Sequence, residues 1–127
     1  MQTLADQIWN RACGFGVTTS VLGAGDLALE AMLSFHGVAM NGGVLHATAC
    51  LDIAKLECAS SGYRYFGLNE VADLLRGTSD RVSNSQDLNS LEVQLNEEYG
   101  RFIPDDSFLF KCFENFLIDK PAAFAPI

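Results

Sequence analysis

The stretch DLALEAMLSFHGVAMNGGVLHATACLDIAKLECAS, residues 26–60, decides the fold. Its 21 residues from 31 to 51 include no Asp, Glu, Lys or Arg, and the tripeptide Asn-Gly-Gly at 41–43 divides them. Apolar residues on both sides of the glycines leave little polar face, and a helix that is apolar nearly all round belongs inside a core. The glycines supply positive-φ residues that end one helix and turn into the next. We therefore expect a buried helical hairpin whose second arm ends near Ser60.

Helical signals precede this hairpin. Thr3, followed three residues later by Asp6, is typical of a weakened capping box at the start of a first helix. Residues 16–22 favour extended structure because they are rich in Val and Thr. After the break at 23–25, Asp26 is predicted to be the N-cap of the central hairpin.

Helical signals also follow it. Residues 68–76 carry an apolar stripe and are predicted to form a helix that ends at Gly77, whereas 78–86 is polar and is predicted to be an exposed loop. Apolar residues recur at helical spacing over 88–102, and a last helix begins at Asp105 or Asp106 and stops before Pro121. The fold class predicted for residues 1–127 is a single compact all-α domain around the hairpin.

Length and composition limit the function. The chain has 127 residues and 49% hydrophobic residues, which is typical of one globular domain. Sixteen acidic residues against eight Lys and Arg give a net charge of −8, which argues against direct nucleic-acid binding, since that requires a basic surface. Residues 84–127 carry eight acidic and three basic residues, so most of the excess lies in the last two helices. Such a surface suits a basic protein partner.

The uncharged segment 31–51 is long enough to cross a bilayer. Its Gly-Gly break and polar residues argue against a membrane span, and the N-terminus has neither the basic start nor the apolar core of a signal peptide. We therefore expect a cytoplasmic protein with free thiols that are small buried residues. The four cysteines are Cys13, Cys50, Cys58 and Cys112.

Residues 23–28, Gly-Ala-Gly-Asp-Leu-Ala, fit a dinucleotide-binding fingerprint with Ala in place of the third glycine. In that motif glycines let the backbone approach a pyrophosphate at a helix N-terminus. Asp26 would place negative charge beside the phosphates, and no βα alternation follows. The alternative is a loop followed by a helix cap, and no cofactor is expected.

His46 and Cys50 are four residues apart and share a helical face, and Cys58 follows on nearly the same stripe. Such a stripe could form a thiolate–imidazole pair or part of a metal site. Because Ala, Leu and Ile surround it and no paired Cys-x-x-Cys or His-x-x-His occurs, core packing is favoured and no metal is assigned. His36 fits no spacing pattern and is interpreted as a core histidine.

The acidic pairs at 97–98 and 105–106 could act as general acid and base, or could be solvated surface residues. A third interpretation is a patch that presents carboxylates where a basic protein expects phosphates, which mainly raises association rate and specificity. The candidate partner-binding residues are Glu92, Glu97, Glu98, Asp105, Asp106, Glu114 and Asp119.

Three short motifs resemble the bacterial DNA-mimic protein family: the apolar helix running into 41–43, Leu-Asn-Glu-Glu-Tyr at 95–99 and Pro-Ala-Ala-Phe at 121–124. The similarity covers about residues 26–124. It implies an all-helical acidic domain, often dimeric, which in its characterised form binds a DNA-binding protein in place of DNA. The chain departs from the family just after the glycines, where Val44 and residues 46–48 replace an aromatic residue, a Gln and further aromatics.

The predicted function is therefore a non-enzymatic acidic domain that docks carboxylates on a basic nucleic-acid-binding protein. An immunity protein that neutralises a toxin is an alternative, because such proteins are also small and acidic. An alternative of a different class is a small thiol or metal enzyme that uses His46 and Cys50.

Overall fold

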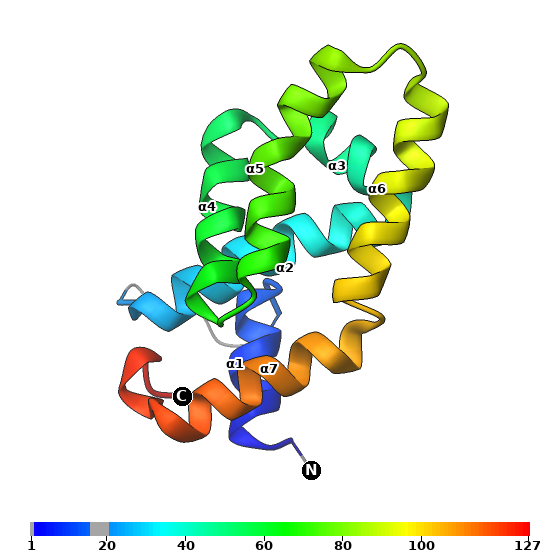
Figure 1. The fold of residues 1–127 in the computed structure, drawn as a ribbon. Helices are drawn as coiled ribbons and strands as arrows, with labels where there is room; N and C mark the ends of the chain where they lie inside the picture. The colour runs from blue at the N-terminus through cyan, green and yellow to red at the C-terminus, as the bar shows by residue number, and fades with distance from the viewer. Residues whose placement is uncertain (1, 16–20) are drawn as a thin grey trace.

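Figure 1 shows the computed structural model, which describes residues 2–15 and 21–127. Within these residues the chain forms seven α-helices, one 3-10 turn and no strand, so the predicted all-α fold is confirmed. The elements are α1 (Leu4–Ala12), α2 (Ala24–Gly42), α3 (Val44–Cys50), α4 (Ile53–Tyr65), α5 (Asn69–Asn84), α6 (Leu88–Phe102), α7 (Asp106–Asp119) and η1 (Pro121–Ala123). No helix of the described segments is long and apolar enough to cross a membrane.

The central element is α2, which contacts α1, α3, α4 and η1 (Figure 1). Its buried side chains fall on one face of the helix: they are Asp26, Leu29, Met32, Phe35, His36 and Ala39. The prediction that this helix is buried nearly all round was wrong, because Leu27 and Met40 are more than half exposed. On the inner face α4 approaches so closely that a Cβ on Gly62 would lie 2.5 Å from the Ala28 carbonyl oxygen.

The second arm of the predicted hairpin is two helices. Gly43, with φ +94°, makes the turn from α2 into α3, as expected for this tripeptide. The backbone leaves the helical region at Leu51, and the Asp52 carboxylate then accepts a hydrogen bond from the Lys55 N–H at 2.8 Å and caps α4. α4 continues to Tyr65, beyond the predicted end. The hairpin is therefore α2 against α4, with α3 as the link.

The predicted end of a helix at Gly77 and the predicted loop at 78–86 were both wrong, because α5 continues to Asn84. Its apolar stripe extends through Thr78, which is fully buried and whose hydroxyl donates to the Leu74 carbonyl at 2.7 Å. Packing of this stripe against α4 and α6 outweighs the cost of about 1 kcal/mol that a glycine imposes on a helix. The loop is confined to residues 85–87, and α6 follows as predicted.

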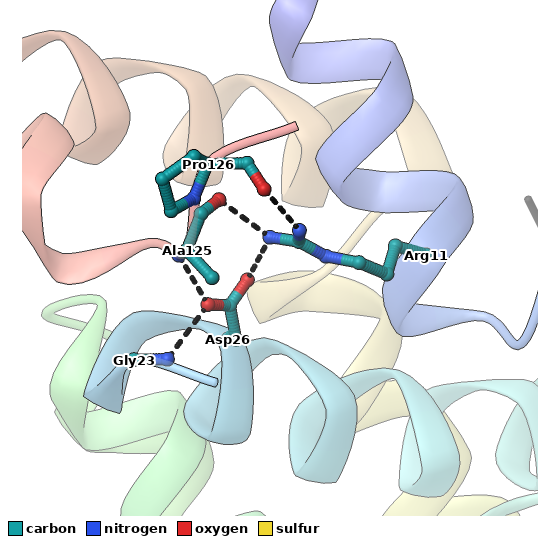
Figure 2. A network of polar contacts seen from close by, with 5 residues as sticks. All are labelled: Arg11, Gly23, Asp26, Ala125 and Pro126. Carbon is teal, nitrogen blue, oxygen red and sulfur yellow. Dashed lines mark hydrogen bonds and ion pairs between the residues drawn. The ribbon is translucent and has the colours of Figure 1, made fainter. Parts of the chain in front are cut away.

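A buried ion pair fastens the last residues of the chain to the start of α2 (Figure 2). The Arg11 guanidinium donates to the Asp26 carboxylate at 2.7 Å and to the carbonyls of Ala125 and Pro126 at 2.9 and 3.1 Å. The same carboxylate accepts from the N–H groups of Gly23 at 2.9 Å and Ala125 at 2.7 Å. The prediction that Asp26 is the N-cap was therefore wrong: Gly23 is the N-cap, and Asp26 is the third residue of the helix.

The glycines of residues 23–28 make room for the chain's own C-terminal segment. A Cβ on Gly23 would lie 2.2 Å from the Ala123 carbonyl oxygen, and one on Gly25 would lie 2.8 Å from the Phe124 ring. In a dinucleotide-binding motif such glycines let the backbone approach a pyrophosphate. Here they let it approach the C-terminal segment of the same chain. At the first helix the predicted Thr3–Asp6 capping box is confirmed. Most of the predicted extended run at 16–22 lies outside the described residues.

Candidate functional site

The acidic residues predicted to bind a partner lie on or beside α6 and α7; in Figure 1 α6 lies along the right side of the molecule and α7 runs across α1 in its lower part. α6 packs against α3 and α5, and α7 packs against α1 and η1. The buried residue Ile103 lies at the corner where the two helices meet. Both helices face the core on one side only, so their other sides are open to a partner.

Three of the seven predicted carboxylates take part in the fold. Glu98 forms an ion pair with Arg81 of α5 at 2.7 Å, and the two side chains are 32% and 34% exposed. Asp105 caps α7 by accepting from the Phe108 N–H at 2.9 Å. Asp106 pairs with the buried His36. Neutralising any of these three would alter stability as well as surface charge.

The other four, Glu92, Glu97, Glu114 and Asp119, are called the α6–α7 carboxylates below. Glu97 and Asp119 are exposed, and Glu92 and Glu114 are half-buried. None of the four belongs to an ion pair between described residues. At 3.6 residues per turn Glu92 and Glu97 point about 140° apart around α6, so they do not share a single stripe.

A chain of hydrogen bonds connects Asp106 to the middle of the core. His36 Nε2 lies 2.5 Å from Asp106 Oδ1, and His36 Nδ1 lies 2.7 Å from the Tyr99 hydroxyl. The Tyr99 hydroxyl lies 2.5 Å from that of Tyr63, which is fully buried. Because a carboxylate only accepts, Nε2 donates to Asp106, and in the tautomer that satisfies every group of the network Nδ1 accepts from Tyr99. Tyr99 in turn accepts from Tyr63, so every donor in the chain has an acceptor.

This arrangement confirms the interpretation of His36 as a core histidine. The ring is buried, and both of its nitrogens have hydrogen-bond partners. Burial raises the pKa of Tyr63 well above its ordinary value, and the neighbouring Tyr99 adds to the rise. Burial likewise raises the pKa of Tyr99. The chain of hydrogen bonds from Asp106 to Tyr63 holds α2, α4, α6 and the start of α7 together.

The predicted stripe of His46, Cys50 and Cys58 is divided between two helices, because α3 ends at Cys50 and Cys58 lies on α4. Cys50 Sγ lies 3.4 Å from His46 Nε2 and 3.6 Å from Nδ1. All four cysteines are free thiols. The prediction that they are buried was wrong for Cys13, Cys50 and Cys58, which are exposed.

A metal site needs several ligands directed at one point. Across residues 2–15 and 21–127, no group of three or more His, Cys, Asp or Glu side chains is placed to hold a metal ion. The arrangement that remains at α3 is a two-residue pair of an imidazole and a thiol.

Comparisons with protein-family models, with curated proteins and with solved structures find no match for this chain. The resemblance to the DNA-mimic family therefore stays a prediction.

Proposed function

We propose that this chain is a non-enzymatic acidic domain that binds the basic surface of a nucleic-acid-binding protein through the α6–α7 carboxylates. The supporting observation is that these four residues, in the most acidic part of the chain, lie outside the described ion pairs and helix caps. The region from residue 84 onward has eight acidic and three basic residues. Ion pairs within the protein offset only part of this excess of negative charge.

Some acidic residues of this region stabilise the helices that they begin, whereas Asp119 does not stabilise its helix. Asp87 and Asp105 accept hydrogen bonds from backbone N–H groups at the starts of α6 and α7, where a negative charge is favourable. Asp119 is the last residue of α7, where a negative charge opposes the helix dipole by about 0.3–1 kcal/mol. Asp119 therefore adds negative charge to this surface at a cost to its own helix.

Binding would follow from complementary charge. Carboxylates on α6 and α7 would present oxygens to Lys and Arg side chains that otherwise contact phosphates, and such complementarity raises the association rate and the specificity. Exposed charges interact through water and are screened by salt, with a Debye length of about 8 Å at physiological ionic strength. The same basic surface would be occupied either by this domain or by nucleic acid.

The proposal is tested by capture of partners from a lysate of the source cell on the tagged protein, at low and at high salt. We expect a DNA-binding protein that is retained at low salt, lost at high salt, and released at constant ionic strength by duplex DNA. Retention that neither salt nor duplex DNA changes would contradict the proposal. A retained toxin that duplex DNA does not release would favour the immunity alternative.

A further inference from the structure

A hollow of about 310 Å³ lies where α2, α3 and the end of α6 meet. Its walls are mostly apolar and include Met40 of α2, Val44 of α3, Gly100 of α6, and Ile103 and Pro104 just beyond α6. Met40 is 55% exposed, so its side chain is largely uncovered at this opening. The surface that carries the last two helices therefore contains an apolar opening as well as carboxylates.

One polar side chain that lines this hollow is held in a fixed orientation. The Asn96 Oδ1 atom accepts a hydrogen bond from the Val44 N–H at 2.9 Å, and the amide packs so closely on Gly43 that a Cβ there would lie 3.1 Å from Oδ1. Because only the oxygen of an amide can accept from an N–H group, this bond settles which way the Asn96 amide faces. Its Nδ2 group has no acceptor among residues 2–15 and 21–127. The Asn96 amide is therefore a positioned donor for a carbonyl oxygen outside this chain.

Carboxylates border the hollow, and no Lys or Arg of the described chain lines it. The Asp106 carboxylate bonds to His36, which lies one helical turn before the lining residue Met40. Glu92 precedes Asn96 by four residues, so the two side chains are neighbours on the same side of α6. An apolar opening with an acidic border complements an apolar side chain that stands between basic ones.

We infer that this hollow anchors the basic partner by taking a leucine-sized apolar side chain that is flanked by Lys or Arg. The inference rests on the proposed function and adds a feature of the partner that charge alone does not specify. Charge complementarity contributes mainly to association rate and specificity, whereas side chains buried in well-packed pockets contribute most of the affinity of an interface. The Asn96 amide donates to a main-chain carbonyl beside the inserted side chain. Val93, which is 57% exposed and three residues before Asn96, extends the apolar contact along α6.

The test measures the binding of two fluorescently labelled peptides to the intact protein at low salt, by fluorescence anisotropy. One peptide is Lys-Arg-Lys-Leu-Lys-Arg-Lys, and the other has Ser in place of Leu, so the two carry the same charge. We expect the Leu peptide to bind about tenfold more tightly, because burial of one Leu side chain in an apolar site is favourable by at least that factor. Equal affinities for the two peptides, or no binding of the Leu peptide, would overturn the inference.

Gly100 allows the hollow to be filled without a change of charge. It lines the hollow, and a Cβ at this position has nothing within 4 Å, so the larger side chain of G100L enters open space. G77L is the matched control, because Gly77 lies within α5, away from the hollow, and its Cβ also has nothing within 4 Å. We expect G100L to bind both peptides with the weaker affinity of the Ser peptide and G77L to keep the preference for Leu, with helical circular dichroism retained in both. A preference for Leu that persists in G100L would refute the hollow as the site.

A variant that neutralises the α6–α7 carboxylates (E92Q, E97Q, E114Q and D119N) separates this inference from the proposed function. We expect it to weaken both peptides by the same factor and to keep the preference for Leu. Weakening of both peptides without any preference for Leu in the unaltered protein would support the acidic surface and overturn the hollow. A preference for Leu that G100L removes, with affinities unchanged in the neutralised variant, would support the hollow and contradict the carboxylates. A dimer in size-exclusion chromatography that G100L alone converts to a monomer would assign the hollow to a second copy and overturn the inference.

Discussion

Arg11 Nη2 and Asp26 Oδ1 lie 2.7 Å apart, in an ion pair whose side chains are only 7% and 5% exposed. This pair joins α1 to α2, and through the carbonyls of Ala125 and Pro126 it holds the C-terminal residues as well (Figure 2). Three segments that are far apart in the sequence therefore depend on one carboxylate and one guanidinium.

Replacing Asp26 by Asn should destabilise the protein strongly. The change leaves the Arg11 charge buried without a counter-ion, and loss of one partner of a buried pair costs about 3–5 kcal/mol. D73N is the matched control, because Asp73 pairs with Arg64 at the surface, with side chains 70% and 44% exposed. An exposed pair contributes at most about 1 kcal/mol. Urea unfolding followed by circular dichroism measures both, and equal losses in the two variants would show that the buried pair has no special role.

Two glycine-to-alanine changes should have opposite signs. A Cβ on Gly62 meets the Ala28 carbonyl oxygen at 2.5 Å, so G62A must push α2 and α4 apart, at a cost of about 1–3 kcal/mol. Gly77 lies within α5 with nothing within 4 Å of its Cβ, so G77A should stabilise the protein by about 0.5–1 kcal/mol. Thermal unfolding measures both, and a lower melting temperature for G77A would mean that α5 is not helical at that point.

The sequence predicted the all-α class, α2, α6 and the capped start of α7, because apolar spacing and cap residues are local signals. The sequence also contained the signal for the missed break between α3 and α4, since Asp52 before Ile53 is an ordinary N-cap. The end of α5 was misplaced because a glycine is a local stop signal, whereas burial of Thr78 depends on tertiary packing.

The acidic surface could be predicted only as a set of residues. The partners of Asp106 and Glu98 lie 70 and 17 residues away in the sequence, and no spacing rule relates residues at such distances. Likewise, the contact of His46 with Cys50 follows from a four-residue spacing, but their exposure depends on which face of α3 turns to the core. The shared helical face of His46 and Cys50 was predicted correctly, whereas the prediction that this face of α3 packs in the core was wrong.

The hydrogen-bonded tyrosines should differ in their contribution to stability. Y99F removes the middle of the chain and leaves both the Tyr63 hydroxyl and His36 Nδ1 buried without a partner, a loss of about 3 kcal/mol. Y63F removes only the terminal donor, which lowers the free energy of unfolding by about 1 kcal/mol. The free energy of unfolding in urea distinguishes the two variants. A Y63F variant as unstable as Y99F would contradict the order of donors derived above.

Stability should fall in alkaline solution. The folded state raises the pKa of Tyr63 and Tyr99 through burial, so it retains phenol protons that the unfolded chain loses near pH 10. Their contribution is therefore complete below pH 10 and declines as the pH rises above it. Absorbance at 295 nm should show these two phenols ionising together with the loss of helical circular dichroism. Ionisation of all three tyrosines near pH 10 with the helices intact would contradict the buried network.

The measurement that tests the central claim most directly is partner capture by two variants of equal charge. One neutralises the α6–α7 carboxylates (E92Q, E97Q, E114Q and D119N), and the other neutralises four exposed acids of α2, α4 and α5 (E30Q, E57Q, E70Q and D80N). Each leaves a net charge of −4 instead of −8. We predict that the first loses the salt-sensitive, DNA-displaced partner and that the second retains it. Equal loss, or retention by both, would contradict a binding surface on α6 and α7.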